Sequence, residues 1–174
     1  MVTPRERFKS TFESLESLYD NTEEPFSLVY IDAGSPRDIQ KRLLQFAEKR
    51  DFTLIRCDKY LAPNQARNLG YQFVTSKYIA FVDNDVIFAP GWLTSLERCA
   101  EETGAMIVTP LTCIGRPVHT IVHNLGAGAE ITMEGGKRVF KQRQHNLIRR
   151  TVNEVRDQVK KRTDGAVRVP RGLD

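Results

Sequence analysis

The sequence has 174 residues, of which 40% are hydrophobic and 28% charged, and these values fit one soluble globular domain. No apolar run approaches the roughly 20 residues that a membrane-spanning helix needs, and the first ten residues lack the apolar core of a signal peptide. Its three cysteines (Cys57, Cys99 and Cys113) form no CxxC pair. This argues against a disulfide framework and predicts a reducing, cytoplasmic location.

The charge is unevenly distributed along the chain. Residues 1–136 hold 14 Lys and Arg against 18 Asp and Glu, a net charge of −4, whereas residues 137–174 hold 12 against 4, a net charge of +8. Such a basic segment can contact an anionic membrane surface, an acidic partner or a second copy of the chain, or it can form a solvated helix. It lacks the interleaved aromatic residues with which single-strand binders stack on bases, and this argues against nucleic acid.

The first two thirds of the chain alternate predicted helices and strands. Thr3, Pro4 and Glu6 have the pattern of a capping box, which predicts a helix from Thr3 to about Asn21. The elements that follow are a strand at 26–32, a helix at 35–50, a strand at 52–58, a helix at 62–76, a strand at 77–83, a helix from Pro90 to Gly104 and a strand at 105–110. Apolar strands separated by helices predict an α/β fold, with a mostly parallel sheet covered by helices on both faces.

The pattern changes after Pro110. Residues 118–132 alternate like antiparallel strands, and the glycine-rich stretch 133–140 predicts a hairpin. Residues 148–163 predict a basic helix with a thin apolar stripe of Ile148, Val152, Val155 and Val159. The sequence therefore predicts a short antiparallel region and a basic C-terminal helix after the parallel sheet.

Acidic residues follow three of the predicted strands. They are Asp32, Asp58, Asp83 and Asp85, and ligands of open parallel sheets bind at this carboxyl edge. Burying an unpaired carboxylate costs several kcal/mol or more, so the acids need a partner. An Asp-x-Asp pair suits Mg²⁺ or Mn²⁺, which take one or two carboxylates and complete their shell with phosphate oxygens and water. The alternative is a turn in which an aspartate caps the next helix.

Two stretches together resemble the family 2 glycosyltransferases of GT-A fold. They are YIDAGSP (30–36) and APNQARNLGYQFVTSKYIAFVDNDVIFAPGWL (62–93), and the resemblance extends over about residues 1–115. It implies a Rossmann-like, nucleotide-sugar-binding α/β domain at 1–115 and a partial acceptor-side region at 116–174. It also implies transfer of a sugar from a nucleotide-diphosphate donor to an acceptor hydroxyl, with Mn²⁺ or Mg²⁺ as cofactor.

The resemblance also implies roles for single residues. Asp32 would hydrogen-bond the base of the donor, and Arg67 would brace the nucleotide. Asp83 would lie near the ribose and the metal, and Asp85 would be the direct metal ligand, with Asn84 as the variable middle residue. Two simpler interpretations remain open: Asp32 could cap the turn that follows it, and Arg67 could form a surface ion pair.

The sequence departs from the family pattern in two places. Only the residues MVTP (1–4) stand before or at the start of the first predicted helix, so the first strand of the family fold is expected to be short or missing, with an exposed sheet edge near the donor site. No acidic motif after Pro110 supplies the carboxylate base that an inverting transferase needs, and Glu130 and Glu134 are the only acids before Glu154. The catalytic base is therefore unassigned, and the chain is expected to be truncated or catalytically incomplete.

Two rival functions share features of this sequence. A haloacid dehalogenase-type phosphatase also carries Asp-x-Asp, but it has Thr two residues after the second Asp, where this sequence has Ile87. A catalytically incomplete nucleotide-sugar or carbohydrate-binding module would explain the missing base.

Several other residues favour structural roles. Trp92 is expected to anchor its helix in the core, and Cys113 to be a small core residue. His119 and His123 share a face on a strand, but without an evident third ligand they favour a structural or acceptor-side role over a metal site.

Overall fold

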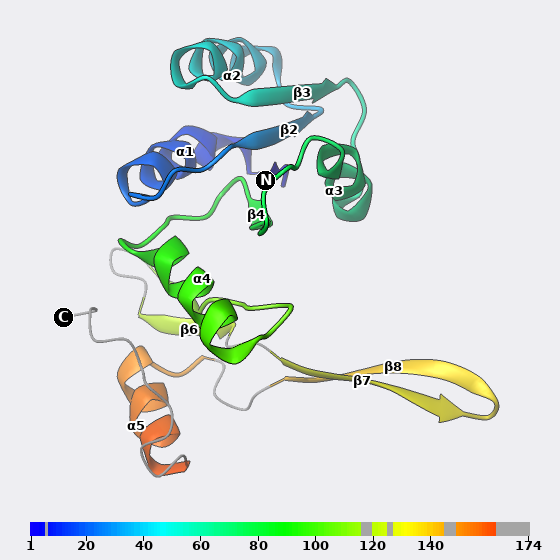
Figure 1. Ribbon diagram of the computed structural model, residues 1–174. Coiled ribbons are helices and arrows are strands. Elements are labelled where there is room, and N and C mark those ends of the chain that lie inside the picture. Colours follow the sequence, from blue (N-terminus) through cyan, green and yellow to red (C-terminus); the bar gives the residue numbers. More distant parts are fainter. Residues whose placement is uncertain (6, 116–119, 125–126, 145–148, 163–174) are drawn as a thin grey trace. The chain divides into compact units, whose positions relative to one another are not determined.

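The computed structural model describes residues 1–5, 7–115, 120–124, 127–144 and 149–162 (Figure 1). The chain forms two compact units, Met1–Glu97 and Arg98–Asp174, which divide inside helix α4. In chain order the elements are β1 (Val2–Thr3), the 3-10 helix η1 (Phe8–Ser10), α1 (Thr11–Asp20), β2 (Val29–Ala33), α2 (Arg37–Arg50), β3 (Thr53–Cys57), α3 (Pro63–Tyr71), β4 (Val82–Asp83), α4 (Trp92–Thr103), β5 (Thr112–Ile114), β6 (Ile121–Asn124), β7 (Ala127–Glu134), β8 (Lys137–Gln144) and α5 (Val152–Arg162). Among the described residues, no helix combines the length and apolar character needed to cross a membrane. The functional boundary predicted at residue 115 stays a prediction.

The first unit is built on a parallel sheet with the strand order β3-β2-β1-β4. Strand β1 has only two residues, yet it lies inside the sheet: Val2 pairs with Tyr30 of β2 and with Val82 of β4. The first strand of the sheet is therefore short, as expected. The expectation of an exposed sheet edge there is wrong, because β1 lies between β2 and β4.

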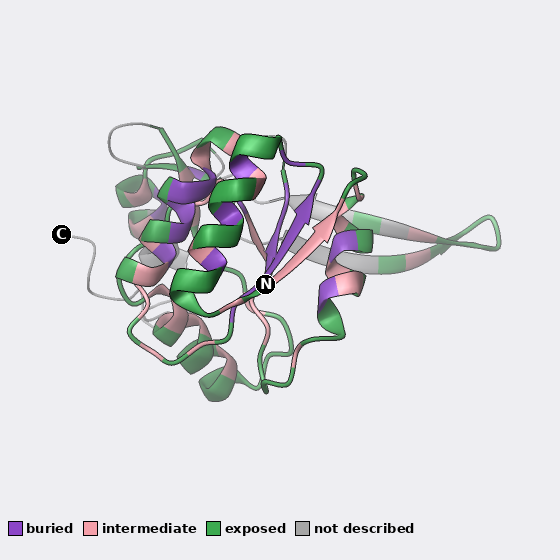
Figure 2. Cartoon of the chain, turned by 90° about the horizontal axis from the view of Figure 1, so that it is seen from above, coloured by how far each residue is buried: buried purple, intermediate pink, exposed green. Residues whose placement is uncertain are grey.

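Helices cover both faces of this sheet. Side chains alternate along β2: Tyr30 packs with Val2 and Leu43 on the side of α1 and α2, whereas Ile31 packs with Ala66 of α3 on the other side. Figure 2 shows the buried strands between these helices. The predicted α/β fold, with a parallel sheet covered on both faces, is confirmed.

The predicted start of the first helix is wrong. Thr3 is not an N-cap but the last residue of β1, and its hydroxyl donates a hydrogen bond to the carbonyl oxygen of Val82 at 3.4 Å. Helix α1 begins only at Thr11. Pairing with two other strands overrides the local capping pattern, and Glu6, the third member of that pattern, lies outside the described residues.

The ammonium group of Met1 is tied to the same sheet. It donates a hydrogen bond to the carbonyl oxygen of Ala80 at 2.8 Å. Burial lowers the pKa of this amine from 8.0 to about 6, because the charged form loses hydration.

Two apolar runs form less regular structure than predicted. The strand expected at 77–83 is reduced to the two residues of β4, and the strand expected at 105–110 is absent. In that second run Met106 is 99% exposed and Ile107 84% exposed. A β-strand needs a partner strand to pair with, and apolar character does not supply one. A short apolar run therefore predicts a strand poorly.

The second unit contains the predicted antiparallel and helical elements. Strand β5 pairs with β6, and β7 pairs with β8 through a turn at Gly135 and Gly136, both of which have positive φ angles. On α5, Val155 and Val152 pack against the buried Val122 of β6. The predicted antiparallel region, hairpin and basic helix are confirmed; Ile148 and the side chain of Val159 lie outside the described residues.

Candidate functional site

A groove of about 250 Å³ opens at the carboxyl edge of the parallel sheet. Its lining follows three neighbouring strands, β1, β2 and β3, and consists of Pro4, Arg5, Phe8, Ala33, Gly34, Asp58 and Tyr60. The backbone of Gly34 has a φ of +81°, and a Cβ there would lie 3.6 Å from the amide nitrogen of Tyr60. Glycine therefore permits the tight turn that shapes this wall of the groove.

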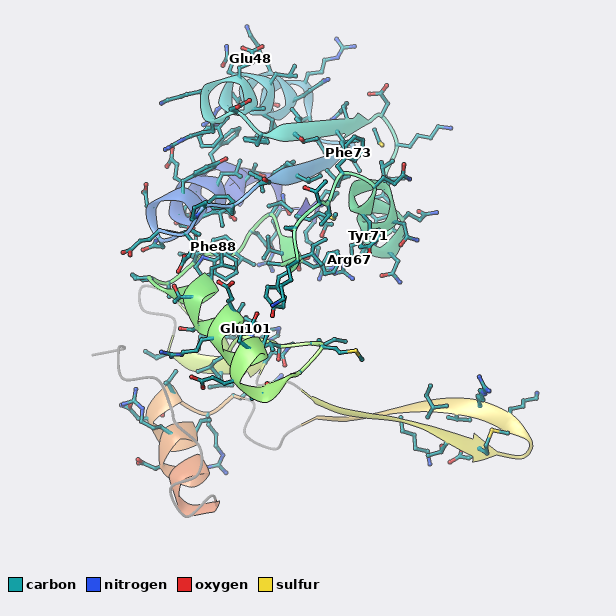
Figure 3. The ribbon with its side chains drawn as sticks, in the orientation of Figure 1. Glu48, Arg67, Tyr71, Phe73, Phe88 and Glu101 are labelled. Carbon is teal, nitrogen blue, oxygen red and sulfur yellow. The ribbon has the colours of Figure 1, made fainter. Side chains whose placement is uncertain are left out.

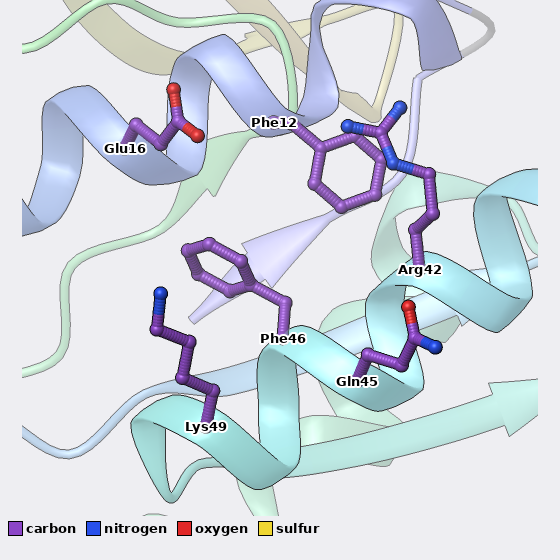
Figure 4. A pocket seen from close by; sticks show the side chains of 6 residues that line it. All are labelled: Phe12, Glu16, Arg42, Gln45, Phe46 and Lys49. Carbon is purple, nitrogen blue, oxygen red and sulfur yellow. The ribbon is translucent and has the colours of Figure 1, made fainter.

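A smaller groove of about 190 Å³ lies between α1 and α2 (Figure 4). Its lining residues come from these two helices: Phe12, Glu16, Arg42, Gln45, Phe46 and Lys49. The guanidinium carbon of Arg42 lies 3.7 Å from the centre of the Phe12 ring, so a cation–π contact occupies one end. The strand-end acids do not line this groove, and the carboxyl-edge groove is the better candidate site.

Asp32 lies beside the carboxyl-edge groove in a buried ion pair. Its side chain is 1% exposed and accepts hydrogen bonds from Nη1 of Arg56 at 2.7 Å, from the Ser35 hydroxyl at 2.8 Å and from the Ser35 amide at 3.3 Å. These contacts satisfy the carboxylate inside the protein and hold the turn that leads into α2. They support the capping interpretation of Asp32; its contact with a donor base stays a prediction.

The partner of Asp32 was missed from the sequence. Arg56 is directly opposite Asp32 in the register of β2 and β3, and its Nε lies 3.3 Å from Asp58. Burial disfavours the charged guanidinium of Arg56, but the hydrogen bonds and charges of Asp32 and Asp58 together outweigh it and raise the pKa of Arg56. The available signal was a single basic residue inside the apolar strand TLIRC, which is costly to bury without a carboxylate beside it.

Each acid of the Asp-x-Asp pair faces an arginine from the segment after β1. Nε of Arg5 lies 3.3 Å from Oδ2 of Asp83, and Nη1 of Arg7 lies 3.7 Å from Oδ2 of Asp85. The Arg5 and Arg7 side chains are 56% and 82% exposed, so each pair contributes only about 0–1 kcal/mol. Another cation could therefore replace either arginine beside its carboxylate with little loss of stability.

The middle residue of the motif is not a spacer. Asn84 is 1% exposed; its Oδ1 accepts a hydrogen bond from the Arg5 amide at 2.6 Å, and its Nδ2 donates one to the Thr11 hydroxyl at 3.0 Å. The side chain therefore ties the acidic pair to the segment between β1 and α1. The prediction that Asn84 is only the variable middle residue of the motif misses this role. No local pattern in the sequence indicates it, because its partners are distant in the chain.

Arg67 projects from α3 near the chain that leads into β4 (Figure 3). Its guanidinium carbon lies 5.7 Å from the centre of the Phe81 ring, two residues before Asp83, and Nη1 donates a hydrogen bond to Asn64 at 3.3 Å. Its Nε is buried, and no residue that the structure describes accepts a hydrogen bond from it. An unsatisfied buried donor costs about 1–3 kcal/mol, so a shift of this side chain that brings its Nε to an acceptor oxygen would be favourable.

The acidic pair has the right chemistry for a hard divalent cation. Asp83 and Asp85 offer carboxylate oxygens and are 34% and 21% exposed. Within the described ranges no group of three or more His, Cys, Asp or Glu side chains could hold a metal ion. The pair therefore fits Mg²⁺ or Mn²⁺ only with further oxygen ligands from a phosphate and water.

Trp92 anchors its helix as expected: its indole N–H donates to the Thr22 hydroxyl at 2.9 Å, and its ring centre lies 4.8 Å from that of Phe88. Burial raises the pKa of the half-buried Cys113.

The remaining candidate residues do not identify the carboxylate base that would activate an acceptor. His123 is exposed on β6, Glu134 forms an ion pair with Lys141, and His119 and the side chain of Glu130 lie outside the described residues.

Comparison with known proteins identifies the family. The family model described as glycosyl transferase family 2 matches residues 5–153. Over 82 residues the chain is 38% identical to an "Uncharacterized glycosyltransferase" of Rickettsia bellii, covering 47% of this chain and 12% of that protein. Over 91 residues it is 28% identical to the "Glucosyl-dolichyl phosphate glucuronosyltransferase" of Haloferax volcanii, covering 52% and 29%. The matched part is thus less than a third of either relative. The family match excludes the phosphatase alternative and extends well beyond the acidic pair: the chain belongs to glycosyltransferase family 2.

Proposed function

We propose that the first unit binds a nucleotide-diphosphate sugar at its carboxyl edge, together with Mn²⁺ or Mg²⁺, for transfer of the sugar to an acceptor hydroxyl. One observation carries the proposal. Arg5 lines the groove that follows β1, β2 and β3, and it also forms an ion pair with Asp83 at the end of β4. A nucleoside in the groove would thus place its diphosphate toward Asp83 and Asp85.

The residues around the groove divide the task of holding the donor. The turn at Gly34 and the side chain of Tyr60 provide walls for the base, with Asp32 behind that turn. Arg67, whose buried Nε finds no acceptor among the described residues, would shift to donate a hydrogen bond to a phosphate oxygen. Asp83 and Asp85 would hold the cation, which when bound acts as a Lewis acid on the departing diphosphate.

An alternative is a binding module that does not complete transfer. It is favoured by the engagement of the candidate acids: Asp32 is buried against Arg56, and Glu134 is paired with Lys141.

The Haloferax relative is named for a lipid-linked sugar acceptor, so dolichyl-phosphate-linked sugars are one acceptor class to test. The cytoplasmic location, the homo-oligomer and the membrane contact of the basic segment stay predictions.

Donor binding and turnover test the proposal directly. We expect calorimetry to detect a nucleoside diphosphate in the presence of Mn²⁺ and much weaker binding with a chelator. Ligand binding to the native state should also raise the melting temperature, since it adds RT ln(1 + [L]/Kd) to the stability. Release of nucleoside diphosphate from donor sugars, with and without acceptors, separates the enzyme from the binding module. Failure to bind any nucleoside diphosphate would refute the enzyme and a nucleotide-sugar-binding module, and would leave only a carbohydrate-binding module.

Arg67→Ala is expected to weaken nucleoside-diphosphate affinity about 10- to 100-fold, because a hydrogen bond to a charged group contributes about 1.5–3 kcal/mol. The measurement is calorimetry at saturating Mn²⁺. Lys49→Ala, which removes one positive charge from the α1–α2 groove, is the matched control and should bind like the unmodified protein. Equal affinities for the two variants would leave Arg67 as a surface residue of α3.

A further inference from the structure

We propose that Arg5 is an exchangeable counter-ion of Asp83, which a divalent cation displaces and which then binds the diphosphate of the donor. This inference rests on the proposed function. It goes further because it assigns a ligand to a residue outside the Asp-x-Asp motif and explains how cation and donor would bind cooperatively.

The first observation is that Arg5 contacts both the groove and the acidic pair. Its side chain lines the carboxyl-edge groove, and its Nε lies 3.3 Å from Oδ2 of Asp83. A cation at Asp83 and the guanidinium of Arg5 would compete for the same carboxylate. When the cation takes Asp83, the displaced guanidinium would still lie beside the groove that the Arg5 side chain lines.

The second observation is that the backbone of Arg5 is tied to a buried group, whereas its side chain is held by an exposed ion pair alone. The Arg5 amide donates a short hydrogen bond of 2.6 Å to the buried Oδ1 of Asn84. The side chain itself is 56% exposed, and its partner Asp83 is 34% exposed. An ion pair this exposed contributes little to stability, so its exchange changes the fold little.

The third observation is that Arg7 repeats the arrangement at Asp85. Nη1 of Arg7 lies 3.7 Å from Oδ2 of Asp85, but Arg7 is 82% exposed and does not line the groove. Both acids thus have a guanidinium group as counter-ion. Of these two arginines Arg5 is the one that lines the groove, and an arginine can bind two oxygens of a diphosphate at once.

The exchange predicts effects of opposite sign on the two ligands. Arg5→Gln removes the competitor of the cation, so Mn²⁺ alone should bind about two- to five-fold more tightly. The same change removes a charged ligand of the phosphate, so nucleoside diphosphate with Mn²⁺ should bind about 10- to 100-fold more weakly. A nucleoside without phosphate should be unaffected, and Arg5→Lys should recover part of the diphosphate affinity.

The test is calorimetric titration of the 174-residue chain with Mn²⁺ alone and with nucleoside or nucleoside diphosphate at saturating Mn²⁺. Lys41→Gln, an equal charge change on the exposed surface of α2, is the matched control and should change none of these affinities. Thermal melting checks that Arg5→Gln is folded; the Arg5 amide remains available to Asn84 in both Arg5 variants.

The outcomes separate this inference from the proposed function. Tighter Mn²⁺ binding together with weaker diphosphate binding supports the exchange. Unchanged diphosphate affinity in a folded Arg5→Gln variant overturns it while leaving the donor site standing, and weaker binding of both ligands overturns it as well. If the unmodified protein binds no nucleoside diphosphate with Mn²⁺, the proposed function and the exchange both fall.

Discussion

Asp85→Asn is expected to abolish Mn²⁺-dependent binding of nucleoside diphosphate and to leave the protein folded. The substitution removes the charge of one of the two carboxylates proposed to hold the cation, and a hard divalent cation depends strongly on charged oxygen ligands. The fold should survive because the ion pair of Asp85 with Arg7 joins partly exposed groups at 3.7 Å. Calorimetry with and without Mn²⁺ measures the effect, which we expect to exceed 100-fold.

Asp20→Asn provides a control for this experiment. Asp20 is exposed at the last position of α1, so its substitution changes the net charge equally without touching the proposed cation site. Normal Mn²⁺-linked binding by Asp85→Asn would show that Asp85 is not a metal ligand. If Mn²⁺ changes nucleoside-diphosphate binding in neither the unmodified protein nor Asp85→Asn, the binding site does not depend on the cation.

Arg56→Leu is expected to lower the free energy of unfolding by about 3 kcal/mol. Removing one partner of a buried ion pair leaves the other charge uncompensated, and such changes cost about 3–5 kcal/mol. Asp32 is 1% exposed, but it keeps two hydrogen bonds from Ser35, which places the expected loss at the lower end. Urea unfolding followed by circular dichroism measures this loss.

Changing Asp32 as well as Arg56 tests whether the uncompensated charge causes this loss. The double variant Asp32→Asn and Arg56→Leu should recover part of the stability, because it leaves no buried charge without a partner. Lys41→Leu, on the exposed surface of α2, should change the stability by less than about 0.5 kcal/mol. A loss below about 1 kcal/mol in Arg56→Leu would mean that Ser35 alone compensates the carboxylate.

The sequence by itself determined the fold class and the edge of the sheet at which the candidate site lies. Apolar strands such as β2 and β3, separated by helices with an apolar stripe, indicate a parallel sheet from short stretches of chain. The carboxyl ends of parallel strands meet at one edge, so the acids at Asp32, Asp58 and Asp83 indicated where a ligand would bind. The family was also evident from two stretches of sequence and is confirmed by the family model.

Only the tertiary structure decided which residues compensate those acids. Asn84 holds the amide of Arg5 across 79 positions of sequence, and Arg56 reaches Asp32 through the register of two strands. Strand β1 has two residues and no local signal; it exists because β2 and β4 pair with it on either side. Strand pairing and ion pairing are contacts between distant segments, whereas periodicity and capping report only on neighbours in the chain. For this reason the capping pattern at Thr3 predicted a helix where the sheet required a strand.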